Sequence, residues 1–200
     1  SKGLSLSAED IYNVNKSSLK DAVVALSWGS CTGEIISKEG LLLTNHHCAD
    51  DLIQFHSTTE KDYLKNGFWA MNKSEELANE NLTASILVRI ENVTERVFSK
   101  INGSGTEEDR RKKIRAVANE ISNEISDTSH YTSRLRSFYG GNEFYLFIYE
   151  TFLDVRLVGA PPSSIGKFGG DTDNWMWPRH TGDFTLLRIY ADTNNKPAKY

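Results

Sequence analysis

Three apolar runs near the start of the chain constrain the fold most strongly. The runs are "DAVVALSWG", "CTGEIIS" and "GLLLT", and the last two are separated by Lys38-Glu39-Gly40. Apolar or alternating segments of this length, divided by a turn that contains glycine, are typical of a β-hairpin. Residues 19–47 therefore predict antiparallel strands.

Further strands alternate with helical patterns along the chain. The segments "TASILVRIENVTERV", "NEFYLFIYETFLDVRLVGAPP" and "DFTLLRIYAD" are strand-like. Residues at about 57–80 and 106–138 have helical patterns, the second with Thr106 and Asp109 as a capping pair. Its apolar stripe, at Ile114, Val117, Ile121 and Ile125, is expected to pack in the core. The fold class predicted is mainly β with helical insertions.

Composition narrows the class of partner. The chain has 200 residues, a formal net charge of −4 and 38% hydrophobic residues, which suits one soluble domain or part of a larger one. No basic segment studded with aromatic residues is present, so a nucleic-acid partner is not expected. No apolar segment approaches the ~18 residues of a membrane span.

The stretch "TNHHC", at residues 44–48, ends the third strand-like run. His46, His47 and Cys48 have three interpretations. Metal ligation is poorly supported, because adjacent strand residues point to opposite faces and no second Cys/His cluster completes a tetrahedral site. Cys48 could be a nucleophile paired with a histidine, or one histidine could be the base of a serine peptidase. The two cysteines, Cys31 and Cys48, are either free thiols or a disulfide.

The serine-peptidase interpretation agrees with the chymotrypsin pattern. In that pattern the base precedes a cysteine in Thr-x-x-His-Cys, which selects His47 rather than His46. The orienting aspartate opens a strand of the form Asp-x-x-Leu-Leu, which is "DFTLL" here and selects Asp183. The two residues are 136 positions apart, and the helical insertions account for the excess over a small barrel.

A closer resemblance lies in longer segments. The segments "GSCTGEIISKEGLLLTNHHC", "GFWAMNKSEELANENL" and "GGDTDNWMWPRHTGDFTLLRIY" resemble the bacterial dipeptidyl peptidases of the dipeptidyl peptidase 7 and 11 type. The resemblance implies part of a chymotrypsin-like double β-barrel, namely the first barrel and the start of the crossover. The chain departs from the family pattern at Ala49-Asp50, directly after the cysteine. It also departs at Trp28 and Ser30, two positions where the family tends to have glycine.

The resemblance also implies roles for particular residues. His47 would be the general base and Asp183 its orienting carboxylate, and Cys31 would pair with Cys48 in a disulfide. Asn174 and Trp175 would bind the free α-amino group of a peptide. An amide carbonyl can accept from an ammonium, and an indole offers a cation–π contact. Neither a cofactor nor a metal is expected.

The nucleophile is the part that the sequence lacks. No Gly-x-Ser-Gly turn follows Asp183, and Ser104, in "NGSG", is interpreted as a linker residue. We therefore expect the amino-terminal part of a longer serine dipeptidyl aminopeptidase, inactive by itself and acting on peptides with a free amino terminus. The family implies a periplasmic, cell-surface or secreted location and is compatible with a homodimer. The alternative is a non-catalytic, peptidase-like module that binds peptides.

Overall fold

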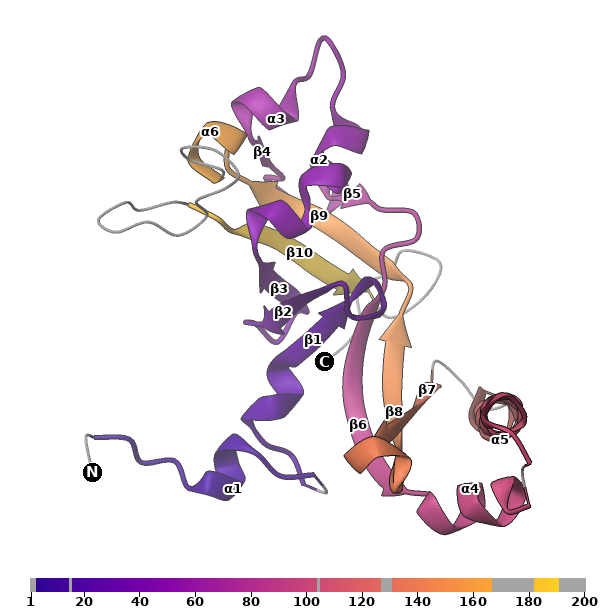
Figure 1. The fold of residues 1–200 in the computed structure, drawn as a ribbon. Coiled ribbons are helices and arrows are strands. Elements are labelled where there is room, and N and C mark those ends of the chain that lie inside the picture. The colour runs from indigo at the N-terminus through magenta and orange to yellow at the C-terminus, as the bar shows by residue number, and fades with distance from the viewer. Residues whose placement is uncertain (1–2, 15, 104, 127–130, 167–181, 191–200) are drawn as a thin grey trace. The chain divides into compact units, whose positions relative to one another are not determined.

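The structure is a computed structural model that describes residues 3–14, 16–103, 105–126, 131–166 and 182–190. The chain divides into two compact units (Figure 1). One unit is formed by residues 1–21 and 85–151, and the other by residues 22–84 and 152–200. The segment 85–151 thus leaves the second unit and returns to it.

The second unit, which holds residues 22–84 and 152–200, is built on an antiparallel sheet. Its strands pair in the order β4-β9-β10-β3-β2-β1, and β5 also pairs with β9. The bounds are β1 (Val23–Leu26), β2 (Cys31–Ile35), β3 (Leu41–Thr44), β4 (Phe68–Trp69), β5 (Leu77–Ala78), β9 (Asp154–Ala160) and β10 (Thr185–Tyr190). Its short helices are α2 (Asp50–His56), α3 (Tyr63–Asn66) and α6 (Ser163–Gly166), with 3-10 turns η2 (Ser27–Gly29), η3 (His46–Cys48) and η4 (Lys73–Glu75).

The antiparallel strands expected within residues 19–47 are confirmed as β1, β2 and β3, although residues 19–22, 27–29 and 46–47 belong to 3-10 turns. Strands β2 and β3 pair antiparallel, and the turn between them has Gly40 at φ +67°. That region of backbone conformation favours glycine because it has no Cβ. At Gly33 a Cβ would lie 2.8 Å from the carbonyl oxygen of Leu43, so the strands can approach closely only with glycine there.

A buried ionic cluster anchors β10 in the same unit. Arg188 Nε donates to Glu76 at 2.8 Å, and the Tyr190 hydroxyl donates to the other carboxylate oxygen at 2.5 Å. Burial, first, and the bond to Glu76 raise the pKa of Tyr190, so the hydroxyl remains a donor. The cluster joins the loop that holds Glu76 to β10, the strand that Asp183 precedes.

The first unit, formed by residues 1–21 and 85–151, packs two helices against a hairpin. Its elements are α1 (Ala8–Ile11), η1 (Leu19–Ala22), β6 (Ala84–Asn92), α4 (Thr94–Ile101), α5 (Glu107–Ser126), β7 (Tyr131–Phe138), η5 (Tyr139–Gly141) and β8 (Glu143–Phe152). Three of these elements, η1, β6 and β8, each have one terminal residue in the second unit. Val117 and Ile121 of α5 are buried against β8, and Ile114 and Ile125 pack beside them. The prediction that this stripe is core is confirmed, and Thr106 caps α5 through the Asp109 N–H at 3.1 Å.

Two helical predictions were too long. In residues 57–80 the helical elements are limited to α3 and the turn η4. Gly67, at φ +74°, ends α3, and the strands β4 and β5 of this segment pair with β9. Asn72 caps η4 through the Ser74 N–H, one of the local bonds by which asparagine competes with a continuing helix. The helix expected over 106–138 ends with α5, and residues 131–138 pair with β8 as β7.

Candidate active site

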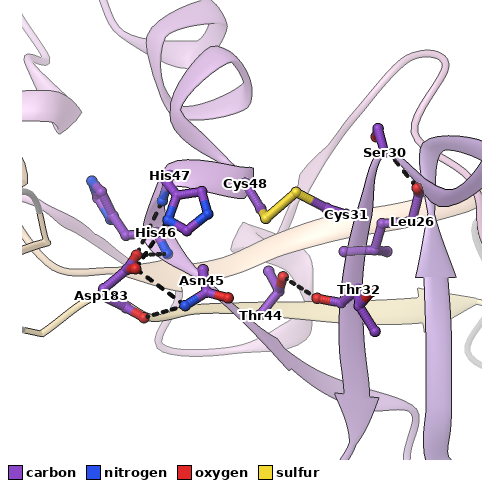
Figure 2. The surroundings of a disulfide bond; sticks show 10 residues. All are labelled: Leu26, Ser30, Cys31, Thr32, Thr44, Asn45, His46, His47, Cys48 and Asp183. Carbon is purple, nitrogen blue, oxygen red and sulfur yellow. Dashed lines mark hydrogen bonds and ion pairs between the residues drawn. A yellow bond between two sulfur atoms is a disulfide. The ribbon is translucent and has the colours of Figure 1, made fainter. Parts of the chain in front are cut away.

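The ends of two neighbouring strands bring the candidate residues together. Strand β3 runs antiparallel to β10, with Thr44 opposite Thr185. Residues that follow β3 and residues that precede β10 therefore meet at one edge of the sheet. Asn45, His46 and His47 come from the first end, and Asp183 comes from the second (Figure 2).

His47 and Asp183 are in direct contact. Nδ1 of His47 lies 2.9 Å from Oδ2 of Asp183. The carboxylate cannot donate when ionised, so Nδ1 carries the proton and Nε2 is the nitrogen that can accept one. The His47 side chain is 47% exposed and that of Asp183 is 12% exposed. The arrangement is a solvent-accessible imidazole oriented by a largely buried carboxylate.

Backbone N–H groups hold the other oxygen of this carboxylate. Oδ1 accepts from the His46 N–H at 2.6 Å and from the His47 N–H at 3.2 Å. Partial burial alone would raise the pKa of Asp183. The bonds from the backbone and ring of His47, its charge and the His46 N–H outweigh burial, so the pKa of Asp183 is lowered. The carboxylate is thereby kept ionised beside the imidazole.

His46 points elsewhere, into the protein. Its ring is fully buried, and Nε2 lies 3.3 Å from Ser163 Oγ and 3.4 Å from Asp50 Oδ1. This second Ser/His/Asp set does not have the geometry of a triad, because both partners approach the same ring nitrogen. The ring also fills the space beside Gly166, where a Cβ would lie 2.5 Å from Cγ of His46.

A disulfide joins the turn that carries His47 to the neighbouring strand. Cys31 opens β2, Cys48 ends η3, and the bond connects them (Figure 2). This is the pairing implied by the resemblance to dipeptidyl peptidases. It attaches the residue after His47 covalently to the sheet.

The remaining candidates lie outside the residues that the structure describes. These are Asn174 and Trp175, proposed from the sequence to bind an α-amino group, and Ser104. Within the described ranges no group of three or more His, Cys, Asp or Glu side chains is placed to hold a metal ion. No helix among those ranges is both long enough and apolar enough to cross a membrane.

Comparison with known proteins identifies the family. The model of the family Peptidase S46 matches residues 1–200. The chain belongs to the peptidase S46 family. An Asp/Glu-specific dipeptidyl-peptidase of Capnocytophaga gingivalis is 53% identical over 198 residues, which are 99% of this chain and 28% of that protein. A dipeptidyl-peptidase 7 of the same organism is 48% identical over 199 residues, 100% of this chain and again 28% of the relative.

Solved structures of Porphyromonas endodontalis DPP11 have the same fold. The crystal structure of Porphyromonas endodontalis DPP11 in complex with substrate aligns with a TM-score of 0.86 and 49% identity, covering 99% of this chain and 30% of that one. A second structure holds the dipeptide Arg-Asp, with the same TM-score. These matches support the predicted class, mainly antiparallel β with helices and part of a chymotrypsin-like barrel. This S46 chain spans about 28% of the length of its curated relatives.

Sequence reasoning missed two contacts at this site. Asn45 donates from Nδ2 to Asp183 Oδ2 at 3.1 Å, and Gly166 lies against the buried ring of His46. Asn45 stands within the same "TNHHC" stretch, but an asparagine after a strand is usually a turn residue. The spacing of Gly166 from His46 carries no signal in the sequence, because the two come together only through the fold.

Proposed function

We propose that the full-length protein is a serine-type dipeptidyl-peptidase that removes dipeptides from the free amino end of peptides. This chain would supply its general base, His47, and the orienting carboxylate, Asp183. The contact between Nδ1 and the carboxylate, in a chain of the peptidase S46 family, carries the proposal. Relatives named as dipeptidyl-peptidases, at 48–53% identity, support it.

The geometry defines what each residue does. Asp183 accepts from Nδ1–H, which leaves the lone pair on Nε2 to take the proton of an attacking serine hydroxyl. The same imidazole then gives that proton to the leaving amine, while the carboxylate stabilises the imidazolium. We place the nucleophilic serine and its oxyanion hole in a part of the protein beyond this chain, which makes the isolated chain inactive.

Recognition of the amino terminus is the second part of this proposal. Asn174 and Trp175 would receive the substrate's ammonium, as the resemblance implies. The amide oxygen would accept from the ammonium, and the indole face would contact it through a cation–π interaction. An exopeptidase that cleaves after the second residue needs a binding site that holds the amino end of its substrate at a fixed position.

We also propose that the protein works outside the reducing cytoplasm, in the periplasm, at the cell surface or secreted. The disulfide between Cys31 and Cys48 supports this location, since disulfides persist in oxidising compartments. Fractionation of the native cells followed by blotting for the protein tests it. Recovery of the protein only in the cytoplasmic fraction would count against this location.

The catalytic proposal is tested with the full-length protein and dipeptidyl reporters that carry a free amino group. His47→Ala should abolish turnover, and Asp183→Asn should lower kcat by ~10⁴-fold because the imidazole takes the wrong tautomer. His46→Ala, the neighbouring control, should retain far more turnover per folded molecule. Reporters with a blocked amino group should be poor substrates. Full activity of His47→Ala would refute the assignment, and a parent protein that binds peptides without cleaving them would favour the non-catalytic module.

A further inference from the structure

Asn45 makes a side-chain contact with the candidate catalytic carboxylate. It directly follows β3, and its Nδ2 lies 3.1 Å from Oδ2 and 3.4 Å from the main-chain oxygen of Asp183. Both partners are acceptors, so chemistry fixes the orientation of the amide, with its NH2 group toward Asp183. The bond is between segments 138 positions apart in the sequence.

The number of donors around this carboxylate shows what the contact adds. An ionised carboxylate offers about four lone-pair sites on its two oxygens. Oδ1 receives the backbone N–H groups of His46 and His47, and Oδ2 receives Nδ1–H of His47 and the amide of Asn45 (Figure 2). Each oxygen therefore has two donors. Two of these four donors are backbone N–H groups and one is the ring of His47, so Asn45 supplies the remaining side-chain donor.

The second bond of Asn45 ties the carboxylate to its own backbone. Because one NH2 group reaches both the side chain and the main-chain oxygen of Asp183, it resists rotation of the carboxylate about χ1 and χ2. Rotation would move Oδ2 away from Nδ1 of His47 and release the tautomer that leaves Nε2 basic. The amide donor also favours the ionised form of the carboxylate.

We propose that Asn45 is a positioning residue of the peptidase, which acts through Asp183 to hold His47 in its basic tautomer. The proposal rests on the proposed function of His47 and Asp183. It predicts an effect on the chemical step and none on the binding of the peptide, because the described contacts of Asn45 are with Asp183 and its own turn.

Three variants of the full-length enzyme test the proposal. Asn45→Ala should lower kcat by about 10-fold or more with KM unchanged, since one hydrogen bond to a charged group is lost. Asn45→Asp keeps the shape but replaces the donor by a second carboxylate, so it should lower kcat further than alanine does. Asn66→Ala, at an exposed asparagine of α3 in the same unit, should match the parent. Thermal melting of each variant reports whether it is folded.

The order of the variants separates positioning from packing. If Asn45 served only to fill space, the isosteric aspartate would be the better tolerated variant, and that result would overturn the proposal. Unchanged kcat in a folded Asn45→Ala enzyme would also overturn it. If Asn45→Ala does not fold, the comparison of Asn45→Asp with the parent still tests the proposal. A parental kcat in Asn45→Asp would show that the amide donor is not needed. Parental activity in both His47→Ala and Asp183→Asn would instead refute the proposed function itself.

Discussion

Replacing Gly166 by alanine should disturb the candidate active site through the buried ring of His46, which lies against Gly166. A Cβ at this position would lie 2.5 Å from both Cγ and Cδ2 of His46 and 2.9 Å from Nδ1. A Cβ essentially never comes within 3.0 Å of a non-bonded heavy atom of another residue, so one of the two residues must move by a substantial fraction of an ångström. The ring of His46 is fully buried and cannot escape into solvent. Overpacking of this kind costs about 1–3 kcal/mol.

The strain should reach the candidate catalytic pair, because His46 precedes His47 in η3 and donates its N–H to Asp183. Gly166→Ala should therefore lower both the melting temperature and kcat of the full-length protein. Gly105→Ala is the matched control, since a Cβ there meets nothing within 4 Å. In a His46→Ala background the cost of Gly166→Ala should largely disappear, because the clashing atoms are gone. Equal costs of Gly166→Ala in the two backgrounds would refute this reasoning.

Three further outcomes follow from the structure. Arg188→Met should destabilise the protein by about 3–5 kcal/mol, because it leaves the buried carboxylate of Glu76 without its cation. Arg96→Met, which removes a surface ion pair, should cost less than about 1 kcal/mol, and denaturant unfolding measures the free energy of unfolding of both variants. Reduction of the disulfide, which spans 17 positions, should cost roughly 3 kcal/mol, measured by melting with and without reductant. The pKa of Asp183 is lowered in the folded state, so its ionised carboxylate stabilises the fold fully above the pKa of the unfolded chain, about 4. This stabilisation is lost as the pH falls towards the pKa of the folded state. Asp183→Asn should therefore make the melting temperature fall less steeply with decreasing pH.

The sequence was sufficient for those parts of the fold that depend on local pattern. The hairpin of β2 and β3 and the buried stripe with Val117 and Ile121 have periodicities and turn residues that act within a few positions. The polar composition of residues 57–80 predicts helix, but the short strands β4 and β5 in this segment pair with β9, about 80 to 90 positions later. Such pairing depends on the partner strand and leaves no local periodicity.

The site shows the same division between local and distant information. The short motif around His47 and the strand-opening position of Asp183 identified the pair, and the structure places them in contact. The contacts of Asn45 and Gly166 were not predicted, because each depends on a residue more than 100 positions away. A sequence motif selects residue types for chemistry, but only the fold shows which neighbours hold them in place.

The architecture explains how the candidate catalytic pair, His47 and Asp183, tolerates so long an interval in the sequence. Its two members are 136 positions apart, yet both belong to the second unit and lie at the joined ends of β3 and β10. The segment 85–151 lies within that interval and returns the chain to the same unit. Strand pairing, the four donors on the carboxylate and the disulfide therefore set the geometry, and all of them come from residues 22–84 and 152–190. The length of the insertion therefore has no influence on the distance between His47 and Asp183.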